Sequence, residues 1–248
     1  TALPLTMSWR LVVLALTIVT LCSAAEKKKK KTVNYDLPPY VGKGCLRNDP
    51  DINKCIVRKG APALMAIVQG DPKYHIPTLD PLVIERLSID QGTKQVGLNL
   101  EIKNCSLYGL HKTKFYNANI DLKKLWCRWD FILDKVVVLG KYKVKGQVLI
   151  LPILGNGDAN ITLTDLKFSY IYNWRLEKRD NGLEYCVVTN NSLPFEVGGM
   201  KINLKNLFNG DRLLGDNMNI FLNENWREIM KEMGPALSES LAEIFRRT

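Results

Sequence analysis

The side chains that most often carry catalysis or bind metal ions are sparse in this chain. Its two histidines, His75 and His111, stand in no spacing typical of metal ligands or of a partner to a nucleophile. The chain contains no G-x-S-x-G segment and no phosphate-binding loop. Because it lacks a positioned base, nucleophile or ligand set, the sequence predicts that the protein is not an enzyme and uses no metal ion or cofactor.

Two segments begin like ligand-binding loops and then depart from the pattern. Residues 155–157, Gly-Asn-Gly, open like a dinucleotide-binding fingerprint, but Asn160 stands where the third small residue belongs. The acidic residues of segment 49–53 open like a calcium loop, but Lys54 replaces the required glycine and Gly60 replaces the closing glutamate. Neither segment therefore indicates a nucleotide or calcium site.

The cysteines are the other reactive side chains. Cys45 and Cys55 lie close in sequence, and the turn-forming residues 48–51, Asn-Asp-Pro-Asp, lie between them. We expect these two cysteines to form a disulfide in an oxidising compartment. The cysteines that follow are Cys105, Cys127 and Cys186. At least one of these three must stay unpaired, and the sequence leaves open which.

The first residues are typical of a secretory signal peptide. A short basic start at Met7 precedes the apolar segment 11–21, and Ser23 and Ala25 supply the small residues before a cleavage site. The apolar segment is too short for a transmembrane helix. We therefore expect residues 1–25 to be upstream residues and a cleaved signal peptide, and the mature protein to be secreted and extracellular.

The composition is that of a folded protein with one large domain. The chain has 248 residues, of which 46% are apolar, and its formal net charge is +10. Five of the positive charges come from one run, Lys27, Lys28, Lys29, Lys30 and Lys31. The remainder is only mildly basic, and secretion removes nucleic acid as a partner. We expect a flexible lysine-rich leader over residues 26–40 and a single domain over residues 41–248.

Three N-x-Ser/Thr triplets are candidate glycosylation sites in a secreted protein: Asn104, Asn160 and Asn190. Asn160 lies on the same face of its predicted strand as the neighbouring threonines, so we expect it to be the strongest acceptor. Asn104 continues an apolar phase and is expected to point inward, unless a bulge resets the register.

Hydrophobic periodicity predicts a helix, a long series of strands and a second helix. Apolar residues recur at intervals of three and four residues over residues 52–68, which indicates a short amphipathic helix. Alternation with a period of two predicts antiparallel strands over residues 95–103, 115–122, 136–150, 159–174, 184–188 and 200–204. Turns are expected at residues 155–158 and 180–182. An apolar stripe predicts a long helix over residues 223–247, kinked at Pro235.

This order of elements predicts an α+β fold. Strands and helices do not alternate, so a doubly wound parallel sheet is excluded. A long antiparallel sheet with one apolar face needs a cover, and the C-terminal helix carries a stripe of similar length. The sequence therefore predicts a strongly curved antiparallel β-sheet wrapped around the long C-terminal helix.

Several motifs resemble those of the insect takeout and haemolymph juvenile-hormone-binding protein family, within the tubular lipid-binding superfamily. They are residues 45–50 and 53–55, residues 76–82, residues 140–142 with Gly146, residues 151–158, residues 207–210 and residues 222–226. The likeness covers nearly all of residues 40–247 in order. It implies a secreted, monomeric carrier whose fold encloses an apolar tunnel. It also implies that the ligand is juvenile hormone, another terpenoid or a fatty-acid-like lipid.

The apolar phases of the strands and the helix stripe supply the residues expected to line such a tunnel. These are Leu87, Ile89, Val96, Leu98, Leu100, Ile102, Val138, Tyr142, Val144, Val148, Ile150, Tyr170, Trp226, Met230, Met233 and Leu237. The hydroxyls of Tyr142 and Tyr170 are candidates to hold a polar end of the ligand. The same residues also fit a closely packed core, and the sequence leaves both alternatives open.

A different class of function starts from the lysine run at residues 27–31. In this alternative the run docks on anionic membranes, and the protein is a surface-active defence or signalling protein whose fold only supports it.

Overall fold

The computed structural model describes residues 38–74, 76, 78–92, 97–180 and 182–247. The expected signal peptide, the lysine run at residues 27–31 and Val96 lie outside these residues. Expectations about them therefore stay predictions.

Helix α2 (Ile52–Val68) forms over the residues that the periodicity predicts. Its buried side chains include Cys55, Ile56, Ala63 and Ile67, which are spaced for one face of a helix. Gly60 also lies on the buried side, where a Cβ atom would come within 2.7 Å of the Phe115 ring. Glycine thus lets the helix approach the sheet closely.

The expected disulfide between Cys45 and Cys55 is present. It ties the segment before α2 to the first turn of that helix.

The strands form one antiparallel sheet. They are β1 (Leu82–Gly92), β2 (Gly97–Tyr108), β3 (Lys114–Asp121), β4 (Trp126–Val148), β5 (Leu151–Lys178), β6 (Glu184–Ser192), β7 (Phe195–Glu196) and β8 (Gly199–Leu204). The order is β1-β2-β4-β5-β6, while β3 pairs with β4, and β7 and β8 pair with β5. Among the described residues, three single turns of 3-10 helix also precede α3: η1 (Pro72–Tyr74), η2 (Leu110–Lys112) and η3 (Phe208–Gly210).

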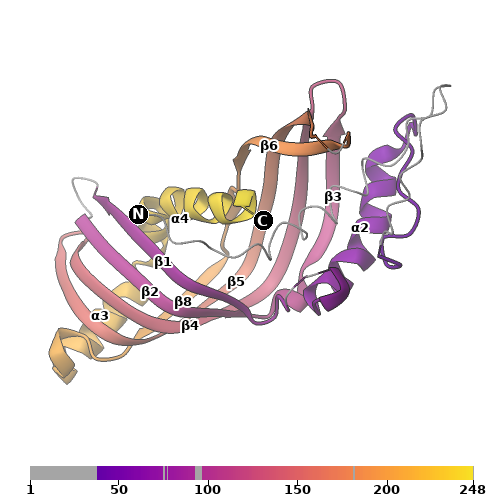
Figure 1. Ribbon diagram of the computed structural model, residues 1–248. Coiled ribbons are helices and arrows are strands. Elements are labelled where there is room, and N and C mark those ends of the chain that lie inside the picture. The colour runs from indigo at the N-terminus through magenta and orange to yellow at the C-terminus, as the bar shows by residue number, and fades with distance from the viewer. Residues whose placement is uncertain (1–37, 75, 77, 93–96, 181, 248) are drawn as a thin grey trace.

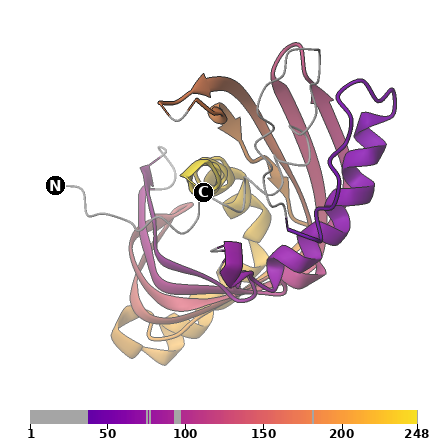
Figure 2. The ribbon, with the colours of Figure 1, turned by 45° about the vertical axis from the view of Figure 1, so that its right-hand side comes forward.

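The long β4–β5 hairpin forms the centre of this sheet. β2 pairs with the C-terminal half of β4, and β3 pairs with its N-terminal half. In the same way β8 and β6 share the length of β5. The sheet curves around the C-terminal helix without closing (Figures 1 and 2). β1 and β6 end the path of paired strands, and β3 and β8, which pair with β4 and β5 alone, are edge strands as well. The predicted strongly curved antiparallel sheet around a helix is confirmed.

The long helix predicted over residues 223–247 is present as α4 (Trp226–Arg247). A further helix that was not predicted, α3 (Arg212–Glu224), precedes it. The break between the two helices lies at Asn225, whose φ of −105° and ψ of 22° are not helical, and α4 continues through Pro235. A kink within α4 at Pro235 therefore stays a prediction.

Helix α3 begins at a side-chain cap that the periodicity analysis overlooked. The Asp211 carboxylate accepts a hydrogen bond of 3.0 Å from the Leu214 N–H, which satisfies one of the free donors of the first turn. Met218 and Leu222 lie one turn apart on the buried face of the helix. α3 packs against β8.

The turn expected at residues 155–158 does not exist, because β5 runs through it. A Cβ atom at Gly155 would lie 2.6 Å from the Tyr142 hydroxyl oxygen, and one at Gly157 would lie 2.3 Å from the Lys205 carbonyl oxygen. These glycines allow a close approach of neighbouring groups within a strand rather than a change of chain direction. The other expected turn, which includes Gly182, does connect β5 to β6.

A bulge reverses the expected orientation of Asn104. The register of β2 with β4 shifts between Lys103 and Ser106, and Asn104 has a φ of +49°. Asn104 is consequently exposed and Cys105 is buried, so the expectation that Asn104 points inward is wrong. Asn160 and Asn190 are exposed as well.

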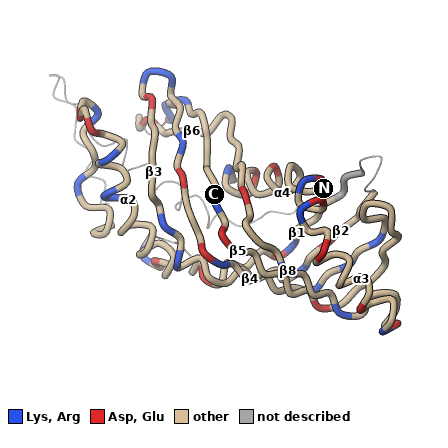
Figure 3. The backbone as a smooth tube through the Cα atoms, turned by 180° about the vertical axis from the view of Figure 1, so that it is seen from behind, with Lys and Arg blue, Asp and Glu red and all other residues tan. Residues whose placement is uncertain are grey.

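Within the part of the chain that the structure describes, no helix combines the length and apolar composition needed to cross a membrane. Basic and acidic residues are interspersed along the strands and helices (Figure 3).

Candidate functional site

One end of the concave face carries an aliphatic cluster that brings together many of the predicted lining residues. β2 and β4 place Leu98, Ile102, Tyr142, Val144 and Val148 on the same face of the sheet. Their cover comes from the two C-terminal helices through Met218, Leu222 and Ile229. Leu100, Val138 and Met233 are half-buried against the same cluster. The period-two alternation thus located one continuous apolar surface.

Tyr142 is the polar member of the aliphatic cluster, and its hydroxyl is already engaged. The hydroxyl donates a hydrogen bond of 2.8 Å to the Lys205 carbonyl oxygen, just after β8. Burial raises the pKa of Tyr142 to about 12, so the hydroxyl stays protonated and able to donate.

The other end of the concave face carries an aromatic cluster beneath α2. It comprises Phe115, Trp129, Phe131, Tyr170, Tyr172 and Trp174, and α2 adds Ile56 and Ala63. Neighbouring rings are in contact: the centroids of Tyr170 and Tyr172 lie 5.0 Å apart, and those of Tyr170 and Phe245 of α4 lie 5.2 Å apart. The predicted lining residue Tyr170 therefore lies in a different cluster from Tyr142.

The larger of two clefts beside α4 follows the seam between the edges of the sheet. It has a volume of about 1040 Å³ and lies between β1, β6 and the C-terminal half of α4. Ile89, Ala236 and Ala242 contribute apolar surface, and Asn191 and Ser192 contribute polar surface. At its rim the Arg246 guanidinium is paired with the Glu243 carboxylate at 2.7 Å.

A smaller cleft of about 510 Å³ lies between α4 and the segment that follows β6. Trp226 and Met230, both predicted lining residues, form part of its wall together with Phe195. The Arg227 guanidinium lies 4.6 Å from the centre of the Trp226 ring. Pro235 and Ser238 line both clefts, so the two clefts adjoin the same part of α4.

One predicted lining residue is misplaced. Ile150 is 78% exposed, because the alternation along β4 ends at Val148 and the hairpin turn begins at Leu149, with a φ of +54°. Leu87 and Leu237 are half-buried, and Leu87 lies directly opposite Ile102 in the ladder of β1 with β2. The structure therefore distributes the predicted residues over two clusters and two clefts along α4.

Residues 15–248 match the family described as haemolymph juvenile hormone binding protein (JHBP). The chain belongs to this family. Among curated proteins, a JHBP-family relative is the circadian clock-controlled protein daywake of Drosophila melanogaster, which is 26% identical over 198 residues. That match covers 77% of this chain and 76% of daywake. Daywake of Drosophila yakuba is 24% identical over 200 residues, with the same two coverages.

A solved structure shares the fold of this JHBP-family chain. Takeout 1 of Epiphyas postvittana is 30% identical, with a TM-score of 0.68, and the match covers 76% of this chain and 85% of that protein. The resemblance that the sequence motifs indicated is thereby confirmed.

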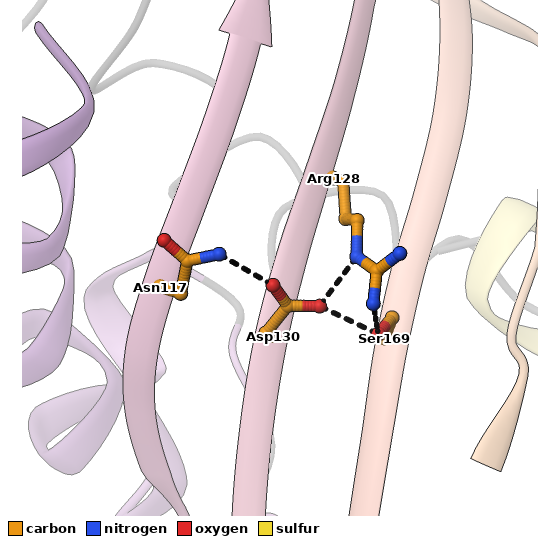
Figure 4. Close-up of polar contacts among 4 residues, drawn as sticks. All are labelled: Asn117, Arg128, Asp130 and Ser169. Atoms are coloured by element: carbon orange, nitrogen blue, oxygen red, sulfur yellow. Dashed lines mark hydrogen bonds and ion pairs between the residues drawn. The ribbon is translucent and has the colours of Figure 1, made fainter.

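A polar cluster that was not predicted lies on the sheet of this JHBP-family domain (Figure 4). Asp130 of β4 accepts hydrogen bonds from Ser169 Oγ at 2.6 Å, Arg128 Nε at 2.7 Å and Asn117 Nδ2 at 2.6 Å. Burial alone would raise the pKa of Asp130, but these three donors hold it below its usual value. The signal was available in β4, where Asp130 stands in the polar phase beside Arg128.

His111 serves as a structural partner of Asp80. The Asp80 carboxylate accepts hydrogen bonds from the Gly109 N–H at 3.0 Å and the His111 N–H at 2.9 Å, and it also contacts the His111 ring. Burial alone would raise the pKa of Asp80, but these contacts lower it. Among the described residues no group of His, Cys, Asp and Glu side chains is arranged to hold a metal ion.

Cys105, Cys127 and Cys186 form no disulfide in the structure. Burial raises the pKa of Cys105 and of Cys186 to about 11, and it raises that of Cys127 as well. These thiols are therefore protonated at neutral pH, which makes them weak nucleophiles.

Proposed function

We propose that this protein is a secreted carrier that holds one small apolar ligand between the concave face of its sheet and α4. The observation that carries the proposal is the apolar concave face of the sheet, whose aliphatic and aromatic clusters both pack against α4, beside a cleft of about 1040 Å³ at the open seam. A site of this kind binds mainly by removing hydrocarbon from water. Membership of the JHBP family supports the same function.

The expected affinity follows from the size of the ligand. A fifteen-carbon chain contributes roughly 12 kcal/mol gross at about 0.8 kcal/mol per methylene, and association opposes this by roughly 4 to 15 kcal/mol. At the lower association cost a net of about 8 kcal/mol remains, which corresponds to a dissociation constant in the micromolar range. Terpenoids such as juvenile hormone and fatty-acid-like lipids are the ligand classes of suitable size and polarity.

The experiment is mass spectrometry of lipids extracted from the natively purified full chain. We expect one class of apolar lipid in a near-stoichiometric amount. An unrelated secreted protein taken through the same purification gives the background. Background lipid alone, together with no saturable uptake of apolar probes after delipidation, would overturn the carrier function.

Secretion is tested separately by expressing the full chain in insect cells. We expect the protein in the medium, with a mature N-terminus at Glu26, because the small residues at Ser23 and Ala25 fit signal peptidase. Retention of the whole chain inside the cells would contradict this part of the proposal.

A further inference from the structure

The turn between β4 and β5 is built from apolar residues. Residues 148–154 read Val-Leu-Ile-Leu-Pro-Ile-Leu and include no polar side chain. Hairpin turns are ordinarily rich in Gly, Asn, Asp and Ser, which suit the turn conformation and face water. In this turn Ile150 is 78% exposed, and Leu154, at the start of β5, is 43% exposed.

Packing within the domain accounts for only some of these residues. Val148 and Ile153 are buried in the aliphatic cluster. Ile150, Pro152 and Leu154 are exposed instead. Neighbouring exposed apolar side chains of this kind mark a surface that contacts another molecule.

A second exposed apolar surface lies at the start of α3, where Leu213 is 74% exposed and Leu214 is 50% exposed. Leu207 connects this helix to β5. A Cβ atom at Gly155 of β5 would lie 3.0 Å from Leu207 Cδ2, and one at Gly215 of α3 would lie 3.7 Å from Leu207 Cβ. The β4–β5 turn and α3 lie at the same end of the molecule, on the left in Figure 1.

The exposed apolar residues of the two elements together form what we call the apolar tip: Ile150, Pro152, Leu154, Leu213 and Leu214.

Basic side chains stand directly behind the apolar tip. Lys143 and Lys145 are exposed on the convex face of β4, and Lys145 lies opposite Leu154 in the ladder with β5. Residues 142–157 contain these two lysines and no acidic residue. The hairpin therefore presents hydrocarbon at its end and positive charge next to it.

The acidic side chains nearest to this part of the hairpin are engaged elsewhere. Asp158 is paired with Lys141. Glu101, which lies opposite Lys143 in the ladder with β2, is paired with Arg86. The start of α3 carries both signs of charge, through Asp211, Arg212 and Asp216. The positive charge at this end thus comes from the hairpin.

We propose that the apolar tip docks this protein on an anionic phospholipid bilayer. Ile150 and Leu213 enter the boundary between headgroups and acyl chains, and Lys143 and Lys145 lie against the anionic headgroups. Hydrocarbon burial and attraction of basic side chains to anionic lipid are the two forces that hold a protein on a membrane surface. A tip-to-tip contact between two copies would instead bring the lysines of both hairpins together.

This docking surface goes beyond the carrier function and does not require a bound ligand. It rests on the proposed function only for its purpose. Leu149 and Leu151 are half-buried against the aliphatic cluster, so they join the apolar tip to the concave face. A docked protein would hold that face next to the bilayer, where an apolar ligand enters or leaves.

The test is co-sedimentation of the natively purified chain with vesicles of phosphatidylcholine alone or mixed with phosphatidylserine. We expect Ile150→Glu and Leu213→Glu each to lower the partition coefficient by about tenfold, because one large apolar side chain no longer leaves water. Lys143→Gln and Lys145→Gln should each lower it by about fivefold on vesicles with phosphatidylserine. These two variants should differ little from the wild type on phosphatidylcholine alone.

Matched controls come from the same two strands away from the apolar tip. Leu176→Glu changes an exposed leucine of β5, and Lys135→Gln changes an exposed lysine of β4. Both should partition within twofold of the wild type.

All the substituted side chains are exposed, so circular dichroism spectra and melting temperatures should match those of the wild type. Glutamate at position 213 also suits the first turn of a helix. Every protein in the series has the same N-terminus, so the contribution of the lysine run at residues 27–31 is equal in all of them.

Three results would overturn the docking surface. The first is a wild type that binds neither kind of vesicle. The second is equal binding by the wild type, Ile150→Glu and Leu213→Glu; loss of that binding on deleting residues 27–31 would then assign it to the lysine run. The third is a sedimentation coefficient that falls in Ile150→Glu while vesicle binding is unchanged, which would make the tip a contact between copies.

The carrier function is judged separately, by uptake of apolar probes in the absence of vesicles. Saturable uptake without vesicle binding would leave the carrier standing and remove the docking surface. Vesicle binding that follows the predicted order of variants, without any uptake of apolar ligands, would do the reverse.

Discussion

Asn223 of α3 forms two hydrogen bonds with the backbone of Ile202 in β8. Its Oδ1 accepts from the Ile202 N–H at 2.8 Å, and its Nδ2 donates to the Ile202 carbonyl oxygen at 2.7 Å. One turn earlier Asn219 makes the same pair of bonds with Leu204, at 2.8 and 2.9 Å. Four helical residues rise about 6 Å, close to the roughly 6.6 Å spanned by two strand residues. The two asparagines thus satisfy the strand edge that another strand would otherwise occupy.

Asn223→Ala is expected to lower the free energy of unfolding by about 2 to 3 kcal/mol, because it leaves a buried N–H and C=O of Ile202 unpaired. Urea denaturation at neutral pH measures the change. Asn217→Ala, at an exposed position of the same helix, is the control and should stay within about 0.5 kcal/mol of the wild type. Equal effects of the two substitutions would contradict the edge-covering role.

Asp130→Asn is expected to destabilise the fold by about 2 kcal/mol at pH 7, because the three donors around the carboxylate favour its charged form. The folded pKa of Asp130 is lowered, so its contribution is present above the unfolded value of about 3.9. The contribution is lost as the pH falls through the folded pKa.

Urea denaturation of both proteins from pH 7 down to acid should therefore show the difference in unfolding free energy shrinking below about pH 4. Asp134→Asn is the control, because the Asp134 side chain is 69% exposed. A difference between wild type and Asp130→Asn that is the same at every pH would show that the carboxylate charge is not what stabilises the cluster.

Replacing both Cys45 and Cys55 by serine should cost roughly 2 to 3 kcal/mol of stability, since the disulfide closes a loop with a sequence separation of 10. Reductant should lower the free energy of unfolding of the wild type by a similar amount and leave that of the double variant unchanged. If reductant left the free energy of unfolding of the wild type unchanged, this disulfide would not contribute to stability.

The strands and α2 could be predicted from the sequence because their side-chain periods are strong. The alternation from Leu98 through Ile102 fixes which residues face the concave side, and the structure keeps that phase. The prediction failed where one residue resets the phase, at the bulge of Asn104 and at the hairpin turn that exposes Ile150. Local sequence does not specify such resets, because they depend on how the partner strand is paired.

Features that depend on distant groups were also overlooked. Gly155 and Gly157 look like turn residues, yet their lack of a side chain accommodates Tyr142 and Lys205, which come from other elements. Helix α3 was not predicted, because its contacts with β8 include asparagines, Asn219 and Asn223, that bond the strand backbone rather than an apolar stripe alone.

The central claim, that an apolar ligand is held along α4, is tested most directly by titrating the delipidated full chain with methyl esters of increasing chain length. The variant is Ala236→Phe, which fills the larger cleft, and the control is Glu228→Phe, at an exposed position of the same helix outside both clefts. The account predicts one saturable site whose affinity rises about fourfold per methylene until the site is full. It also predicts that Ala236→Phe shifts the preference to shorter chains while its fold is retained, and that Glu228→Phe binds like the wild type. Binding that never saturates, or a chain-length preference identical in all three proteins, would contradict it.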